Sequence, residues 1–202
     1  MIPAPRGQLA PDAPAEPLAT WANLVTIIRV VAGMIVFAIA ADRGDPDWNL
    51  VGLGIYWSLD IVDGFLARSL DQETRLGAQM DIIGDRLLVT FFYFNHLASH
   101  PWLLPPVALF LFEFVGIDLF LSIQFLRWPI KSPNYFHLID RRIWWLNWSV
   151  WGKLGNTGLV TLLLLGTGWI WVPAAVCAAL IAVKVYSCLL LLRLPPAESR
   201  WR

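Results

Sequence analysis

The sequence predicts an all-α integral membrane protein with six transmembrane helices and with both termini in the cytoplasm. Composition is the first reason: 57% of the 202 residues are hydrophobic and only 15% are charged, whereas soluble domains are about half apolar and a quarter charged. The second reason is that the apolar residues form six stretches, each near the length of about 20 residues that crosses a bilayer. The formal net charge is zero, so the global charge does not indicate a nucleic-acid partner.

The predicted spans follow these stretches in order: Ala22–Ala41, Asn49–Arg68, Gly77–His96, Leu103–Leu126, Ser149–Thr167 and Trp171–Leu192. The second and third stretches contain aspartates, so we expect them to fail a strict hydropathy criterion for membrane spans. We identify them as spans by their length and by the spacing of their aspartates. Together the spans make one domain over residues 21–194. Residues 1–20 are expected to form a disordered cytoplasmic tail, because they are rich in Pro and Ala and lack a hydrophobic core. Residues 195–202 form a second short tail.

Positive charges set the orientation, because Lys and Arg concentrate in cytoplasmic loops. An even number of spans places both termini on the same side. The loops and tails of that side carry most of the positive charge: Arg6, Arg75, Arg127, Lys131, Arg141, Arg142, Arg193, Arg200 and Arg202. The opposite loops hold Arg43 alone, among Asp42, Asp45 and Asp47. We therefore expect a protein of the cytoplasmic membrane whose loop between the second and third spans faces the cytoplasm.

The most informative segment runs from Asp60 to Asp85 and reads DIVDGFLARSLDQETRLGAQMDIIGD. Residues three or four apart share a helix face, so Asp60 and Asp63 line the second span while Asp81 and Asp85 line the third. A carboxylate at membrane depth is costly without a partner, and four that converge need a compensating cation. Their oxygen-only ligand set suits Mg2+, Mn2+ or Ca2+ rather than zinc. The segment therefore predicts a divalent-metal site.

Small and basic residues in the same segment favour a phosphate-bearing ligand. Gly64, Ala67 and Gly77 carry little or no side chain, which leaves room for a flat or bulky ligand against the backbone. Arg68 has a planar, permanently charged fork that suits a phosphate. Two Mg2+ or Mn2+ ions held by the four carboxylates would neutralise such a ligand and activate its phosphorus. The alternative is a structural role, in which the aspartates pair with Arg68 and Arg86; it leaves the glycines and the repeated spacing unexplained.

The segment resembles the signature of the CDP-alcohol phosphatidyltransferases, in particular of the bacterial phosphatidylglycerophosphate synthase-like and phosphatidylinositol phosphate synthase-like members. The resemblance implies a membrane enzyme of phospholipid synthesis that transfers a phosphatidyl group from a CDP-diacylglycerol-like donor to a polar alcohol and releases CMP. It implies that Asp60, Asp63 and Asp81 hold the metals. Asp85 would be both a metal ligand and the base that takes the acceptor's hydroxyl proton. A homodimer is also expected from the family.

The resemblance also predicts which residues contact the cytidine diphosphate of the donor: Asp60, Gly64, Ala67, Arg68, Gly77, Asn23 and Thr26. The last two belong to the segment Asn23-Leu24-Val25-Thr26-Ile27-Ile28-Arg29, which is similar to the N-L-x-T-x-x-R opening of phosphatidylglycerophosphate synthases. Asn23, Thr26 and Arg29 share one helix face. Arg29 either reaches the membrane interface or meets the acidic cluster, and an arginine inside a span is a functional candidate by default.

Cationic side chains are the candidates for binding the acceptor: Arg29, Arg141, Arg142 and Lys153. The segment from Gly152 to Thr157 is similar to the G-K-x-K-T entry of phosphatidylglycerophosphate synthases, but Gly155 stands in place of the second lysine. The opening of the first span favours glycerol 3-phosphate as the acceptor, and this departure weakens that assignment. Inositol phosphate or another polyol phosphate stays open, as does a CDP-alcohol donor with a diacylglycerol acceptor.

Two further features are not explained by the signature. Between the fourth and fifth spans, the segment Arg127–Trp148 has two prolines near its start that break any helix, and it is amphipathic from Asn134 on, which predicts a helix lying on the cytoplasmic leaflet. Its apolar side would hold Phe136, Ile139, Ile143 and Leu146. Lys184 lies deep in the sixth span, where an unpaired ammonium is costly, so it should face a polar cavity or pair with Glu113 or Asp118.

The rival from another class is a cation-coupled transporter, in which intramembrane carboxylates carry the coupling ion. Such proteins have broken helices and repeated halves, whereas the signature aspartates sit in one hairpin with no counterpart in the second half of the chain. A scaffold that has lost catalysis is a third possibility, and the intact signature argues against it. The sequence shows no Ser/His or Cys/His arrangement that would indicate a hydrolase.

Overall fold

The computed structural model describes residues 7–9, 16–17, 19–166 and 168–195. Over these ranges the chain is helical, apart from turns and an isolated antiparallel β-bridge between Gln8 and Ile130. It forms two compact units. The first contains residues 15–104 and holds the whole signature. The second contains Met1–Pro14 and Pro105–Arg202.

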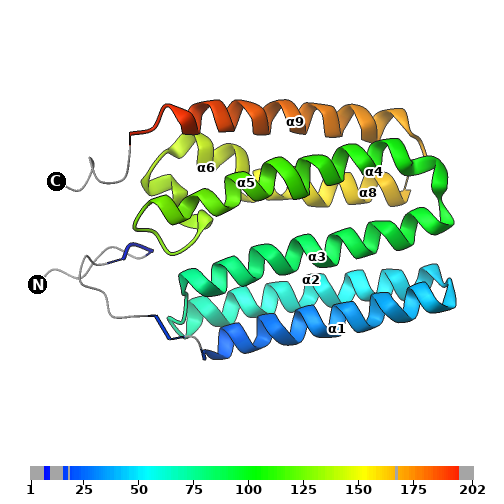
Figure 1. Ribbon diagram of the computed structural model, residues 1–202, viewed down its shortest axis with the longest axis horizontal. Coiled ribbons are helices and arrows are strands. Elements are labelled where there is room, and N and C mark those ends of the chain that lie inside the picture. The colour runs from blue at the N-terminus through cyan, green and yellow to red at the C-terminus, as the bar shows by residue number, and fades with distance from the viewer. Residues whose placement is uncertain (1–6, 10–15, 18, 167, 196–202) are drawn as a thin grey trace, which may run out of the picture. The chain divides into compact units, whose positions relative to one another are not determined.

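The first unit consists of three long helices and a short 3-10 turn: α1 (Trp21–Arg43), α2 (Pro46–Ser69), α3 (Arg75–Ser99) and Pro101–Leu103. Figure 1 shows α1, α2 and α3 side by side, and each of the three packs against the other two. A short polar side chain accepts a hydrogen bond from a backbone N–H at each N-terminus, which caps the helix. These capping residues are Thr20, Asp45 and Thr74.

Glycines allow these helices to approach closely. A Cβ atom added to Gly52 would lie 2.5 Å from the Phe37 ring, and one added to Gly33 would lie 2.8 Å from the Leu88 side chain. Small residues at helix contacts are typical of membrane bundles, where close van der Waals packing holds the helices together. This packing sets the distance between the faces that carry the signature residues.

The second unit begins with one helical run that changes its geometry along its length: α4 (Leu104–Leu111), the π-helical segment η2 (Phe112–Asp118), α5 (Leu119–Ile123) and the 3-10 turn η3 (Gln124–Arg127). Shorter elements follow: the 3-10 helix η4 (Pro133–Leu138), α6 (Arg141–Asn147), α7 (Val150–Lys153), the π-helical segment η5 (Leu154–Leu159) and α8 (Val160–Gly166). The long helix α9 (Trp171–Leu192) completes the unit and packs against α8, α6 and η2.

Every predicted span is helical where the structure describes it, apart from Ser149, which caps α7, and the bounds are close to those expected; Thr167 lies outside the described residues. Four helical runs are long and apolar enough to cross a membrane: Trp21–Arg43, Pro46–Ser69, Pro101–Arg127 and Trp171–Leu192. The second of these carries Asp60 and Asp63, so the expectation that its aspartates exclude it was wrong. Neither α3 nor the run from α7 to α8 is in this set. Six membrane crossings therefore stay a prediction.

The predicted amphipathic helix after Asn134 is instead two short helices, η4 and α6. The break has a local cause, because Asp140 accepts hydrogen bonds from the backbone N–H groups of Arg142 and Ile143 at 2.8 and 2.9 Å and starts a new helix. The amphipathic pattern itself is largely confirmed. Phe136, Ile139 and Ile143 are buried, whereas Leu146 is only half-buried.

Part of the predicted N-terminal tail is paired with the second unit. The N–H of Leu9 donates to the carbonyl of Pro129, and the N–H of Lys131 donates to the carbonyl of Gly7, both at 2.9 Å. Gly7 has a φ of 89°, in the left-handed region that favours glycine. Most of residues 1–20 and nearly all of 195–202 lie outside the described residues.

Candidate metal centre

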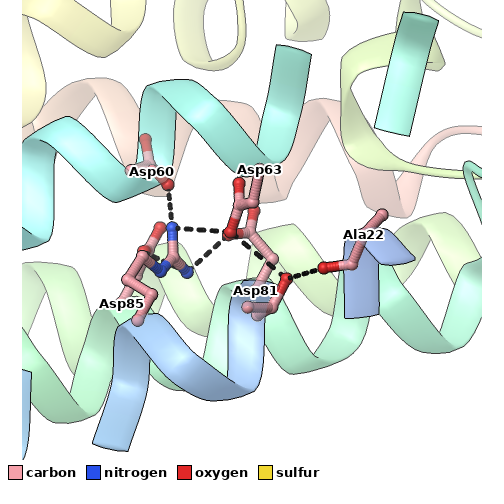
Figure 2. A network of polar contacts seen from close by, with 7 residues as sticks. Ala22, Asp60, Asp63, Asp81 and Asp85 are labelled. Atoms are coloured by element: carbon pink, nitrogen blue, oxygen red, sulfur yellow. Dashed lines mark hydrogen bonds and ion pairs between the residues drawn. The ribbon is translucent and has the colours of Figure 1, made fainter. Parts of the chain in front are cut away.

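Four carboxylates converge in the first unit, where the acidic faces of α2 and α3 meet. Asp60 and Asp63 come from α2, and Asp81 and Asp85 come from α3. One oxygen each from Asp60, Asp63 and Asp81 lies within 4.8 Å of the others, and Figure 2 shows Asp85 beside them. The structure thus brings together the four residues whose spacing predicted convergence.

The four carboxylates differ in exposure. The side chain of Asp63 is 7% exposed and that of Asp85 is 23% exposed, whereas Asp60 and Asp81 are 43% and 42% exposed. Asp63 therefore lies at the buried, inner end of the cluster, and Asp60 and Asp81 form its open rim. A ligand can reach the rim oxygens from outside the helices.

Arg29 of α1 places its guanidinium between these carboxylates and is fully buried. Its Nη1 pairs with Asp60 Oδ1 and lies 3.3 Å from Asp63 Oδ2. Its Nη2 lies 2.7 Å from Asp81 Oδ1 and 3.2 Å from Asp85 Oδ1. Dashed lines in Figure 2 mark these contacts around the guanidinium nitrogens. Of the two places expected for Arg29, the structure confirms the acidic cluster.

Tyr56 belongs to the same site, and our sequence analysis missed it. Its side chain is 5% exposed, and its ring centroid lies 5.7 Å from the guanidinium carbon of Arg29. A guanidinium over an aromatic face is a favourable cation–π contact. The signal was present in the spacing, since Tyr56 precedes Asp60 by one helical turn and shares its face.

Asn23 and Thr26 approach the cluster from α1. The Thr26 hydroxyl lies 3.2 Å from Asp63 Oδ2 and 3.1 Å from the Ala22 carbonyl, so it can donate to either oxygen. Asn23 is buried, and its Oδ1 would lie 2.5 Å from a Cβ atom added to Gly77. Gly77 thus permits close contact between α1 and α3, a role that differs from the predicted space for a nucleotide.

Arg68 lies at the end of α2, on the exposed side of the site. Both of its terminal nitrogens are 3.3 Å from the position that a Cβ atom of Gly64 would take. The guanidinium therefore folds back by one turn over Gly64, while Ala67 is half-buried beside it. The structure places Gly64, Ala67 and Arg68 next to Asp60 and Asp63 on α2, and their contact with a nucleotide stays a prediction.

Comparison with known proteins agrees with this arrangement. The sequence model that describes the CDP-alcohol phosphatidyltransferase family matches residues 19–134, which is more than half of the chain. The chain belongs to this family. With its apolar helices, this membership indicates a multi-pass membrane protein.

Two characterised relatives share part of this sequence. A CDP-diacylglycerol–glycerol-3-phosphate 3-phosphatidyltransferase of Cereibacter sphaeroides is 34% identical over 102 residues, covering 48% of this chain and 46% of the relative. A CDP-diacylglycerol–inositol 3-phosphatidyltransferase of Candida albicans is 38% identical over 64 residues, covering 32% of this chain and 27% of the relative. The chain thus spans less than half of either relative's length. No solved structure gives a significant match.

In this family member, the cluster has the properties of a site for a hard divalent cation. Its donors are all carboxylate oxygens, the ligand type that Mg2+, Mn2+ and Ca2+ prefer. Asp85 Oδ1 is buried and lies 3.2 Å from Arg29 Nη2 in an ion pair without a hydrogen bond, so it keeps a lone pair that a metal ion can use. Four carboxylates face one guanidinium, which leaves an excess of negative charge. The residues therefore fit a bound metal.

The remaining acceptor candidates lie in the second unit. Arg141 and Arg142 are exposed in the first turn of α6. Lys153 is exposed at the end of α7, and its Nζ donates to Asn134 Oδ1 at 2.7 Å. This contact joins Lys153 to the segment that carries η4. An acceptor-binding role for Arg141, Arg142 and Lys153 stays a prediction.

The second unit also holds a sealed cluster of polar side chains. Lys184 of α9 pairs with Asp118, and its Nζ lies 3.9 Å from Glu113 Oε1. With its amide oriented to donate, Asn156 of η5 reaches the two oxygens of Glu113 at 3.0 and 3.2 Å. All four residues are buried. The predicted pairing of Lys184 with the acidic residues of the fourth span is thus confirmed.

Proposed function

We propose that this chain is an enzyme of phospholipid synthesis that transfers a phosphatidyl group from a CDP-diacylglycerol-like donor to a polar alcohol and releases CMP. The observation that carries the proposal is the convergence of the four signature carboxylates in a member of the CDP-alcohol phosphatidyltransferase family. The names of both relatives describe phosphatidyl transfer from CDP-diacylglycerol to an alcohol. A cation-coupled transporter has no comparable support.

In this proposal Asp60, Asp63, Asp81 and Asp85 hold two Mg2+ or Mn2+ ions. Bound metal would neutralise the diphosphate and polarise the phosphorus under attack. The exposed oxygens of Asp60 and Asp81 are on the side from which the diphosphate approaches. Asp63, at the buried inner end of the cluster, is oriented by the Thr26 hydroxyl, which lies 3.2 Å from Asp63 Oδ2. Such outer contacts hold a ligand in the geometry that its metal needs.

Asp85 acts as the general base. Its side chain is 23% exposed, and its Oδ1 forms an ion pair with Arg29 but no hydrogen bond. It can therefore accept the proton of the acceptor's hydroxyl group. The hydroxyl oxygen then forms a bond to the donor phosphorus that carries the diacylglycerol, and the bond from that phosphorus to the bridging oxygen breaks. CMP leaves with the bridging oxygen.

The donor nucleotide lies along α2 and α3 in this account. Arg68 moves from its place over Gly64 to contact the diphosphate, because its exposed guanidinium can change rotamer without opening the core. Gly64 and Ala67 let the cytidine approach the backbone of α2, with Asn23 and Thr26 on the facing side of α1, while Gly77 lets Asn23 come close to α3. The lipid tails of the donor stay in the bilayer.

Glycerol 3-phosphate is the favoured acceptor, supported by the relative from Cereibacter sphaeroides and by the opening of α1. Arg141, Arg142 and Lys153 are the proposed contacts of its phosphate. Inositol or an inositol phosphate is the second candidate, supported by the relative from Candida albicans and by Gly155 in place of a lysine. Either acceptor uses the same transfer chemistry.

The proposed membrane arrangement has six crossings, cytoplasmic termini and an active site that faces the cytoplasm. The positive charges of the loops support this orientation. The segment with η4 and α6 would lie at the cytoplasmic leaflet, because Arg141 and Arg142 are exposed on it together with Trp145, and tryptophan and basic residues are common at the membrane interface. The enzyme is proposed to act as a homodimer in the cytoplasmic membrane.

The test is CMP release by the purified protein in detergent, with Mg2+ or Mn2+, CDP-diacylglycerol and a panel of acceptors that includes glycerol 3-phosphate, inositol and inositol phosphate. We expect CMP with one acceptor and a loss of roughly 10²–10⁴-fold in Asp85→Asn, the range that a general base contributes. Asp42→Asn is the matched control, because Asp42 is exposed in the last turn of α1. Equal CMP release by Asp85→Asn and the wild type would refute the assignment of the base.

A further inference from the structure

We propose that Arg29 is a built-in counter-cation of the carboxylate cluster, which holds the metal ligands together when no metal is bound and competes with metal for them. The inference rests on the proposed metal-binding role of the four aspartates. It differs from the predicted role of Arg29 in acceptor binding. It assigns to α1 a direct influence on metal affinity.

The contacts of Arg29 join three helices at one point. Its side chain starts on α1, Nη1 contacts Asp60 and Asp63 of α2, and Nη2 contacts Asp81 and Asp85 of α3. The guanidinium is fully buried, so solvent screens these contacts little. Without its charge, four carboxylates of like sign would face one another and push α2 away from α3. Arg29 therefore stabilises the metal-free site in the arrangement that metal needs.

The guanidinium uses the same oxygen atoms that a metal would use. Asp60, Asp81 and Asp85 each present Oδ1 to Arg29, and Asp63 presents Oδ2. Mg2+ binds oxygens at about 2.0–2.1 Å and Ca2+ at about 2.3–2.6 Å. The ligand oxygens of Asp60, Asp63 and Asp81 lie within 4.8 Å of one another, so an ion among them takes space next to the guanidinium. Two cations in this space repel each other, and metal binding must displace Arg29 from part of its contacts.

Tyr56 gives the displaced guanidinium a second favourable position. Its ring already lies 5.7 Å from the guanidinium carbon, and a contact with the ring face requires no carboxylate oxygen. Arg29 Nε is buried and makes no hydrogen bond to a described residue, so rotation of the side chain breaks no contact at that atom. The side chain can therefore move toward Tyr56 and stay inside the site.

The test compares Mn2+ binding by the wild type, Arg29→Gln, Arg29→Lys and the control Arg43→Gln, by calorimetry on protein stripped with EDTA. Arg43 lies at the end of α1 and is exposed. We expect Arg29→Gln to bind Mn2+ about 10-fold more tightly, because the competing charge is absent. Arg29→Lys should fall between it and the wild type, since an ammonium lacks the fork that reaches both helices. Arg43→Gln should match the wild type.

Thermal unfolding gives a readout independent of activity. Arg29→Gln should unfold at a lower temperature than the wild type in EDTA, and Mn2+ should raise its unfolding temperature by more than it raises that of the wild type. Unchanged or weaker Mn2+ binding in Arg29→Gln would overturn the inference. If Arg29→Gln cannot be purified, Arg29→Lys decides: tighter binding supports the inference, and equal or weaker binding overturns it. Failure of every protein, including the wild type, to bind Mn2+ would instead refute the proposed metal site.

Discussion

The two charged clusters of this protein differ in charge balance and in access. In the first unit, four carboxylates surround Arg29, and two of them are more than 40% exposed. In the second unit, two carboxylates surround Lys184, whose own side chain is 2% exposed, and the Asn156 amide contacts one of them. The open cluster has an excess of negative charge that a metal ion can neutralise. The charges of the sealed cluster are closer to balance, and its side chains are at most 8% exposed where ion pairs are formed, which fits a role in holding helices together.

The sealed cluster also coincides with irregular helix geometry. Glu113 and Asp118 lie in the π-helical segment η2, and Asn156 lies in η5. A π-helical turn shifts the register of the side chains that follow it. Of these two segments, η2 carries both carboxylates that Lys184 meets, and η5 carries the amide that reaches Glu113. The open cluster needs no such irregularity, because α-helical spacing alone aligns its aspartates.

The largest expected effect is loss of the charge at the centre of the sealed cluster. Lys184→Met should lower the free energy of unfolding by about 3–5 kcal/mol, because it leaves buried carboxylates without their cation. Denaturant unfolding in mixed micelles measures this change. Mn2+ binding at the open cluster should be unaffected. Adding Asp118→Asn to Lys184→Met should recover part of the loss, and an additive further loss would contradict the structural role.

The next largest effect is expected from removing the buried carboxylate of the open cluster. Asp63→Asn should weaken Mn2+ binding by about 100-fold or more, because even the outer partners of metal ligands contribute roughly 10–100-fold. The protein should still fold in EDTA, since the substitution removes one of four like charges. Calorimetry and thermal unfolding measure the two quantities, with Asp42→Asn as the control. Wild-type Mn2+ affinity in Asp63→Asn would show that the cluster is not the metal site.

A smaller effect concerns the close contact of α1 with α3. Gly77→Ala should lower the free energy of unfolding by about 1–3 kcal/mol, the usual cost of overpacking, because the new Cβ would meet Asn23 Oδ1 at 2.5 Å. Gly54→Ala is the matched control on a neighbouring helix, since its Cβ would meet nothing within 4 Å. Denaturant unfolding of both variants checks the difference. Equal stability of the two would contradict the packing role of Gly77.

The smallest effect tests the aromatic contact of Arg29. Tyr56→Leu should destabilise the metal-free protein by about 1 kcal/mol, within the range of cation–π contacts, whereas Tyr56→Phe keeps a ring and should cost less. Thermal unfolding in EDTA compares the two variants. Equal loss in both would assign the effect to the hydroxyl group and not to the ring face.

Spacing within regular helices made the candidate site predictable from sequence. The aspartates, Asn23, Thr26 and Arg29 all follow intervals of three or four residues, and the structure keeps α1, α2 and α3 helical through them. Tyr56 follows the same interval before Asp60, but a lone tyrosine in an apolar stretch carries no chemical signal of its own. The place of Arg29 depended on the tertiary approach of α1, which glycine packing sets and periodicity does not show.

The sequence was less informative in the second unit, where side chains compete for backbone hydrogen bonds and the helix geometry changes along the chain. The helix expected after Asn134 breaks because the Asp140 side chain takes the N–H groups that a continuous helix would use. The π-helical turns η2 and η5 have no sequence period that distinguishes them from α-helix. The sequence predicted that Lys184 could pair with Glu113 or Asp118, and in the structure Lys184 contacts both.

The most direct test of the central claim is the metal dependence of CMP release from CDP-diacylglycerol with the preferred acceptor. The wild type should release no CMP in EDTA and should regain activity with Mg2+ or Mn2+, whereas Asp63→Asn should stay inactive at the metal concentration that saturates the wild type. Asp42→Asn should behave as the wild type does. CMP release that persists in EDTA, or that survives in Asp63→Asn, would contradict a metal-dependent transferase built on these four carboxylates.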